Sequence, residues 1–171
     1  GYYNPLIRHH IKSIDSNNII SVGDKMMGYK SIQEKVGQDY IIKLVNSEEY
    51  SVLNVESDKS KAGYSVDTVK LKSVDSDFNT SINIVQQTSY VDYLNGFNKL
   101  LEGALKQRKW GPYYELLGQH TLMQTLDKRL GRMYHHNKPD ELRKDIDYGY
   151  ACTIHKSQGS TYQNVFVDLD D

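Results

Sequence analysis

The side chains best suited to chemistry are concentrated near the C-terminal end of the sequence. Within 153–161, hydroxyl, imidazole, ammonium and amide groups surround one glycine: Thr153, His155, Lys156, Ser157, Gln158, Gly159 and Thr161. Hydroxyl, imidazole and ammonium groups can donate hydrogen bonds to phosphate oxygens, and a glycine lets a ligand approach the backbone. The residue types therefore indicate a phosphate-binding segment. A strand end with polar caps is the purely structural alternative.

Apolar residues flank this polar segment on both sides. They predict buried strands over 149–154 and 165–169, which are typical of an α/β core. Polar groups at the C-terminal end of such a strand lie where α/β sheets usually bind ligands. Cys152 falls inside the first apolar run, so we expect its thiol to be buried and unreactive.

Hydrophobic spacing divides the rest of the chain into a helix, a β-rich region and a helical region. Apolar residues at helical spacing predict a short helix over 4–14. Alternating and β-branched runs, separated by turn residues, predict strands at 19–29, 40–45, 50–55, 64–74 and 82–85. Three- and four-residue spacing then predicts helices over 93–105 and 113–134, with a break at 110–112 where Pro112 interrupts the pattern.

Length and composition exclude several classes of protein. The 171 residues, 38% hydrophobic and 25% charged, suit one ordinary domain or two small ones. The sequence lacks an apolar run of about 20 residues and a secretory signal, so no membrane partner is expected. One cysteine cannot form an internal disulfide, which fits a cytoplasmic protein. The adjacent pairs His9–His10 and His135–His136 have no cysteines to complete a zinc set, so no metal site is expected.

Positive charge is concentrated in the helical region. Residues 99–144 contain 10 Lys and Arg against 5 Asp and Glu, which leaves 11 against 17 in the remainder. Such a stretch can bind a polyanion, although a solvated helix surface has the same composition. Trp110 and Tyr113 lie beside these charges and could stack on single-stranded DNA; packing anchors at a helix break are the alternative.

The segment Thr-Ile-His-Lys-Ser-Gln-Gly at 153–159 closely resembles motif V of superfamily 1 helicases, T-x-H-K-[SA]-Q-G, in the RecD-like and Dda-like branch with a UvrD-like C-terminal domain. Two weaker resemblances precede it in the order that this family has. Residues 4–8, Asn-Pro-Leu-Ile-Arg, are similar to the N-x-x-I-R helix near the start of the second motor domain. Residues 22–27, Val-Gly-Asp-Lys-Met-Met, are similar to the G-D-x-V-M strand that leads into an inserted barrel.

The resemblance implies an α/β fold with a β insertion. Part of a RecA-like motor domain, called 2A, would be interrupted by a small SH3-like β-barrel, called 2B, and a helical hairpin. We expect 2A to begin over 1–28 and the barrel to occupy 29–88. The helical segment and a loop would follow over 89–147, and the chain would return to 2A, with motif V, over 148–171.

The resemblance also implies roles for individual residues. Thr153, His155, Lys156 and Ser157 would contact single-stranded DNA. A nucleotide would lie near Gln158, Gly159, Thr161 and Arg8, although many relatives have Glu where Thr161 stands. Lys156 and Arg8 could equally be ordinary surface charges, since a lone exposed Lys or Arg usually is.

The function implied is an ATP-dependent DNA helicase, most similar to translocases that move 5′ to 3′. No G-x-x-x-x-G-K-[ST] phosphate loop occurs, and the sequence ends at Asp171 before the arginine motif that follows motif V in this family. We therefore expect ATP and Mg²⁺ to bind only in an intact enzyme that includes the missing N-terminal RecA-like motor domain. The alternative is a non-enzymatic SH3-like module that binds nucleic acid or protein.

Overall fold

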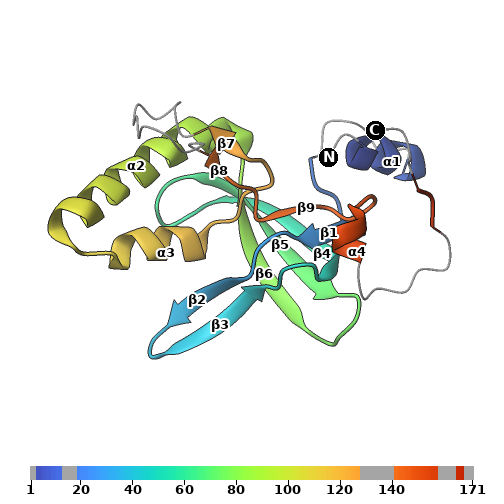
Figure 1. The fold of residues 1–171 in the computed structure, drawn as a ribbon, viewed down its shortest axis with the longest axis horizontal. Coiled ribbons are helices and arrows are strands. Elements are labelled where there is room, and N and C mark those ends of the chain that lie inside the picture. The colour runs from blue at the N-terminus through green and yellow to red at the C-terminus, as the bar shows by residue number, and fades with distance from the viewer. Residues whose placement is uncertain (1–2, 13–18, 128–140, 158–164, 168–171) are drawn as a thin grey trace.

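The computed structural model of the chain describes residues 3–12, 19–127, 141–157 and 165–167. A mixed α/β fold is formed, in which an antiparallel sheet lies between a helical pair on one side and two short helices on the other (Figure 1). The pair is α2 (Tyr90–Gln107) and α3 (Gly111–Gln119), and the short helices are α1 (Tyr3–Lys12) and α4 (Ile154–Ser157). None of the described helices is both long and apolar enough to cross a membrane.

The main sheet contains five antiparallel strands in the order β6-β5-β4-β1-β9. Their bounds are Lys25–Gly28 for β1, Glu49–Lys59 for β4, Ser65–Ser73 for β5, Asn79–Val85 for β6 and Ile146–Tyr148 for β9. The alternation of apolar and polar residues in β5 buries Val66, Val69 and Leu71. Met26 of β1 lies opposite both Tyr50 and Tyr148, so the last strand of the sheet comes from the far end of the chain.

A separate two-stranded hairpin connects β1 to β4. It consists of β2 (Ile32–Val36) and β3 (Asp39–Leu44), and its turn uses Gly37 at a φ of 66°. An ion pair of 2.9 Å joins Lys43 Nζ to Glu34 across the two strands, and the same ammonium donates to the Ser81 carbonyl oxygen of β6 at 3.4 Å. The contact with Ser81 ties the hairpin to the main sheet.

The strands described within 29–88 do not close into the barrel that the sequence predicted. The hairpin β2–β3 and the run β4–β6 belong to different sheets. β1 and β9 occupy the edge of β4 that a closed barrel would pair with another strand of the insertion. The antiparallel pairing of these strands was predicted correctly. The prediction that they close into a barrel was wrong.

The helical region is shorter than predicted. α2 ends where Arg108 takes a left-handed conformation at φ 58°, and α3 begins with Pro112 in its first turn. The second helix was predicted to reach residue 134 but ends at Gln119, because His120 is extended and Thr121 pairs with Ile84 of β6. Two short strands follow, β7 (Leu126–Asp127) and β8 (Glu141–Leu142), which pair with each other. Residues 128–134 of the predicted helix lie outside the described residues.

The two C-terminal strands were also predicted wrongly. β9 ends at Tyr148, and the last sheet contact is Gly149 N–H donating to the Lys25 carbonyl at 2.8 Å. The chain then leaves the sheet, so Cys152 and Thr153 are exposed rather than buried. Val165, Phe166 and Val167 form no strand and are exposed, Phe166 at 98%, while residues 168 and 169 of the predicted strand lie outside the described residues.

His120 is a titratable group enclosed between the sheet and the helical pair. It is 1% exposed, and its ring centroid lies 5.5 Å from those of both Tyr64 and Tyr93. Nδ1 lies 3.0 Å from the Leu116 carbonyl, to which it donates, and Nε2 has no partner among the described residues. Burial lowers the pKa of His120, although the bond to Leu116 acts in the opposite direction.

We predict that the free energy of unfolding falls as the pH drops below about 6.5. In that pH range His120 is protonated in the unfolded chain but stays neutral in the folded chain. The free energy of unfolding therefore falls by at most about 1.4 kcal/mol per pH unit. Urea titrations at pH 7.5 and 5.5 measure the effect. His120→Phe keeps a ring against Tyr64 and Tyr93 and cannot titrate, so it should lose part of the pH dependence. An unchanged pH dependence would contradict this prediction.

Candidate functional site

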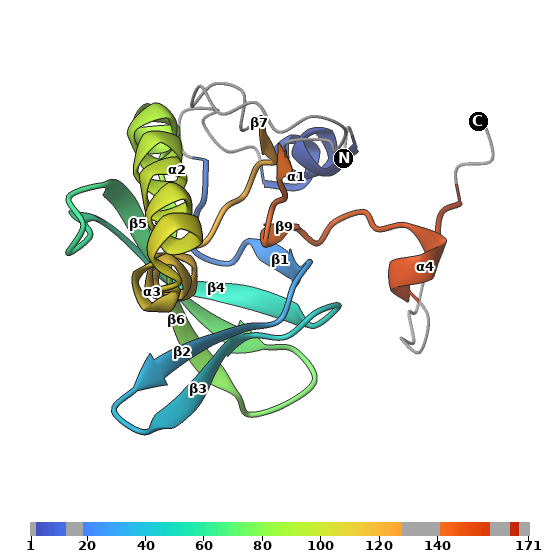
Figure 2. The same ribbon diagram turned by 60° about the vertical axis from the view of Figure 1, so that its left-hand side comes forward.

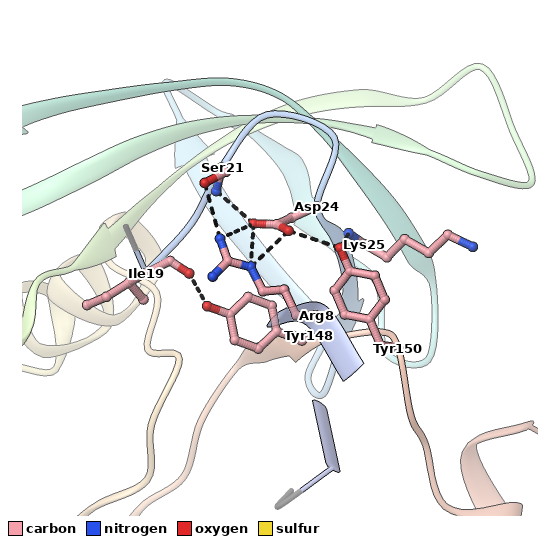
Figure 3. Close-up of polar contacts among 7 residues, drawn as sticks. All are labelled: Arg8, Ile19, Ser21, Asp24, Lys25, Tyr148 and Tyr150. Carbon is pink, nitrogen blue, oxygen red and sulfur yellow. Dashed lines mark hydrogen bonds and ion pairs between the residues drawn. The ribbon is translucent and has the colours of Figure 1, made fainter. Parts of the chain in front are cut away.

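A buried ion pair between Arg8 and Asp24 connects the first two segments that resemble helicase motifs (Figure 3). Arg8 Nε donates to both carboxylate oxygens of Asp24, at 3.0 and 3.1 Å, and Nη2 donates to Oδ2 at 2.9 Å. Asp24 is 0% exposed, and it also accepts from the Ser21 backbone N–H at 2.7 Å. Burial acts to lower the pKa of Arg8, but the hydrogen bond to Asp24, together with the charges of Tyr148, Asp24 and Tyr150, outweighs it and leaves that pKa raised.

Two tyrosines from the end of β9 complete this cluster. The Tyr150 hydroxyl donates to Asp24 Oδ1 at 2.9 Å, while the Tyr148 ring lies 5.0 Å from the guanidinium carbon of Arg8. The Tyr148 hydroxyl donates to the Ile19 carbonyl oxygen, as Figure 3 shows. Burial is the main reason that the pKa of Tyr148 is raised to about 12. At neutral pH both hydroxyls are therefore protonated donors.

Asn4 fixes the chain just before the motif V segment. Its side-chain amide donates to the Ala151 carbonyl at 2.9 Å, and its carbonyl oxygen accepts from the Ala151 N–H at 2.5 Å. This pair of bonds reproduces the pattern of a strand partner at a residue that has left the sheet. The asparagine and arginine of the first motif thus contact different parts of the same C-terminal segment.

The segment that resembles motif V begins as a single helical turn at the surface. The Thr153 carbonyl accepts from the backbone N–H groups of Lys156 and Ser157, and the Ser157 hydroxyl donates to the Ile154 carbonyl at 2.8 Å. The Thr153 side chain is exposed. The side chain of His155 and the residues Gln158, Gly159 and Thr161 lie outside the described part of the structure.

The Lys156 side chain lies back against the protein. Its ammonium is 2.5 Å from Asn46 Oδ1, 3.2 Å from Ser47 Oγ and 3.3 Å from the Gly28 carbonyl oxygen, and it lies 4.7 Å from the centroid of the Tyr29 ring. Desolvation lowers the pKa of Lys156. The Lys144 ammonium also contacts the Tyr29 ring, at 4.4 Å, and pairs with Asp147.

The predicted stacking residues lie far from the motif V segment. Figures 1 and 2 place α3 and α4 on opposite sides of the sheet. Trp110 is half-buried, with its ring centroid 5.7 Å from that of Tyr113, and Tyr113 in turn packs against Phe97 at 5.3 Å. Tyr114 is the exposed member of this cluster. The structure therefore brings Arg8 to Tyr148, shortly before the 153–157 segment. The aromatic cluster of Trp110, Tyr113 and Tyr114 lies apart from that segment (Figures 1 and 2).

Among the residues predicted to lie near a nucleotide, the structure describes Arg8, and its guanidinium faces Asp24 and Ser21. A phosphate would have to compete with a fully buried carboxylate for the same nitrogens.

Comparison with known proteins finds a viral relative of this chain. No protein-family model matches the chain. It is 30% identical over 112 residues to "Uncharacterized protein R530" of Acanthamoeba polyphaga mimivirus, a match that covers 63% of this chain. The chain spans 21% of the length of that protein.

Several residues of the candidate site have no distinguishing signal in the sequence. Tyr148, Tyr150 and Tyr29 belong to a set of 14 tyrosines with no pattern that separates them. Asp24 stands out only as part of the Gly-Asp pair in the second motif. That pair is the one local signal for it, because Gly23 has a φ of 79° and turns the chain so that Asp24 precedes β1 directly.

Proposed function

We propose that this chain is part of an ATP-dependent DNA helicase and that its 153–157 segment contacts the phosphate backbone of single-stranded DNA. One observation carries the proposal. The first two segments that resemble helicase motifs and the residues just before the third meet in one hydrogen-bonded cluster through Asn4, Arg8, Asp24, Tyr150 and Ala151. Segments that act together should be neighbours in space, and this proximity supports the proposal.

The exposure of the segment supports the same proposal. Thr153 and Ile154 are exposed, and α4 projects away from the sheet in Figure 2. A hydroxyl and backbone groups at such a position can reach a phosphate without displacing core residues. Thr153, His155 and Ser157 are the side chains that we assign to this contact.

We expect the Thr153→Ala/His155→Ala double variant to weaken binding of a fluorescent single-stranded oligonucleotide by about tenfold, which corresponds to the loss of one or two hydrogen bonds. Titration at 50 and 200 mM salt measures the affinity and its salt dependence, because phosphate contacts release counterions. Binding should weaken steeply at the higher salt for the unaltered chain.

Thr88→Ala/Gln124→Ala is the matched control, since both side chains are exposed and lie outside the motif segments. It should bind like the unaltered chain. If the two double variants bind equally well, the DNA contact is not on the 153–157 segment. If the unaltered chain does not bind, the proposed contact is wrong for this chain.

ATP hydrolysis and translocation would belong to the longer protein. In that protein an N-terminal RecA-like domain would supply the phosphate loop, and Mg²⁺ would accompany ATP. The finer fold assignment, a 2A domain interrupted by a β-rich 2B insertion, is part of the same proposal. The antiparallel β4–β6 run and the adjoining β2–β3 hairpin supply the strands for such an insertion.

A second candidate function is a binding module that acts without catalysis. The β2–β3 hairpin favours it, because Val36, Tyr40, Ile41 and Ile42 are all about half exposed or more. Consecutive strand residues point to opposite faces, so both faces of the hairpin are uncovered near its end. Single-strand binding that ignores Thr153 and His155 but is lost in Tyr40→Ser/Ile42→Ser would support this module instead.

A further inference from the structure

The Lys156 ammonium is fully used within the chain. An ammonium has three donor hydrogens, and three oxygens surround it within 3.3 Å: Asn46 Oδ1, Ser47 Oγ and the Gly28 carbonyl. The Tyr29 ring face lies against the same charge. A phosphate oxygen could bind Lys156 only after one of these contacts is broken. The side chain is thus arranged to hold α4 and not to reach outward.

The oxygens that receive Lys156 belong to a hydrogen-bonded turn. The Ser47 N–H donates to the Gly28 carbonyl at 2.9 Å, and the Gly28 N–H donates to the Glu48 carbonyl at 3.0 Å. Ser47 has a φ of 66°, a left-handed conformation that the surrounding bonds maintain. The turn between β3 and β4 is therefore tied to the end of β1 independently of Lys156.

We propose that Lys156 is a positioning residue that fastens the 153–157 segment to the 28–29 and 46–47 positions, so that the DNA contact of this segment depends on the β insertion. The inference rests on the proposed function for its DNA-binding consequence. We call the group formed by Lys156, Gly28, Tyr29, Asn46 and Ser47 the Lys156 anchor.

The first test compares Lys156→Gln with Asn46→Ala in the oligonucleotide titration. Asn46 is exposed, and its substitution leaves the lysine charge in place. For a positioning role, both variants should weaken binding about three- to tenfold, and the double variant should be no weaker than Lys156→Gln alone. The slope of affinity against salt should stay nearly the same.

A direct phosphate contact gives a different result. Lys156→Gln would then reduce the salt slope by about 0.7, the contribution of one phosphate on a single strand. Asn46→Ala would leave binding unchanged or strengthen it, because the lysine would be released toward the DNA. That pair of results would overturn the proposal.

The second test does not depend on DNA. Cys152 is exposed and is the chain's single cysteine, so a fluorescent maleimide reports on the segment next to α4. Fluorescence anisotropy of the label should fall in both Lys156→Gln and Asn46→Ala, because the segment gains mobility. Lys99→Gln, which removes an exposed charge from α2, should leave it unchanged.

The two tests separate the inference from the proposed function. If the unaltered chain fails to bind the oligonucleotide, the DNA function is wrong, and the label still decides whether the anchor exists. Equal anisotropy in the unaltered chain and both anchor variants would overturn the anchor. Circular dichroism and the urea midpoint of each variant confirm that it is folded.

Discussion

Replacing Asp24 by alanine should lower the free energy of unfolding by about 3–5 kcal/mol, because it leaves a buried guanidinium without its carboxylate. The side chain of Arg8 is 10% exposed and that of Asp24 is 0% exposed, so water cannot substitute for the lost partner. The Ser21 N–H and the Tyr150 hydroxyl lose the same acceptor. Urea unfolding monitored by circular dichroism measures the change through the midpoint at constant slope.

Two further variants show whether charge is the cause. Arg8→Met/Asp24→Leu removes both charges and should recover part of the loss, since an apolar pair avoids the desolvation of the ions but leaves the Ser21 N–H and the Tyr150 hydroxyl without that acceptor. Asp75→Ala removes an exposed carboxylate between β5 and β6 and should change stability by less than about 0.5 kcal/mol. A loss as large in the double variant as in Asp24→Ala would show that packing, not the uncompensated charge, dominates.

The effect of Asp24→Ala should extend to residues 150 and 151, just before the 153–157 segment. Tyr150 loses a partner in Asp24, and Tyr150 is the neighbour of Ala151, which Asn4 holds. The ion pair thus stabilises the fold and also fixes where the C-terminal segment leaves the sheet.

Local patterns predicted the elements whose burial follows a simple period. β5 buries the apolar residues of its alternating pattern on one face. α2 likewise buries Tyr93, Leu94 and Phe97 on one face against the core. β2 was not predicted, because Ile-Gln-Glu-Lys-Val places polar residues at its centre and buries only Ile32. That strand forms because it pairs with β3 in a hairpin, and the pattern of apolar residues in β2 does not predict this pairing.

The helix predicted beyond Gln119 fails for a related reason. Leu116, Leu122 and Leu126 are apolar residues within the predicted helix, and all three are buried. The last two are buried by extended backbone instead: the Leu122 N–H donates to the Asp145 carboxylate, and Leu126 pairs opposite Leu142. Contacts with Asp145 and Leu142 outweigh the helical preference of residues 120–127. The sequence of this segment alone therefore cannot reveal that its backbone is extended.

The site was predictable only in part. Residues 153–159 were identified by composition and order, but the partners of Arg8 and Lys156 were not. Arg8 pairs with a residue 16 positions away, and Lys156 contacts a turn more than 100 positions away. No local spacing rule relates such residues, because the fold alone brings them together. Cys152 shows the same limit: its apolar neighbours suggested burial, but the chain has already left the sheet there.

Gly28→Ala should be the second most damaging substitution, with a loss of about 3 kcal/mol at the upper part of the range for overpacking. An added Cβ would lie 2.2 Å from the Val45 carbonyl oxygen, which is backbone and cannot rotate away. The turn over 45–48 must therefore move, and its bonds to Gly28 must lengthen. Thermal or urea unfolding measures the loss.

The chain provides a matched control for the same chemical change. Gly103 lies inside α2, and an added Cβ there would meet no described atom within 4 Å, so Gly103→Ala should stabilise the protein by about 0.5–1 kcal/mol through helix propensity. Opposite signs at the two glycines would identify close backbone approach as the cause at Gly28. The same sign at both would contradict it. Because Gly28 and the 46–47 turn also receive Lys156, Gly28→Ala should lower the anisotropy of a Cys152 label, which links this backbone contact to the position of the 153–157 segment.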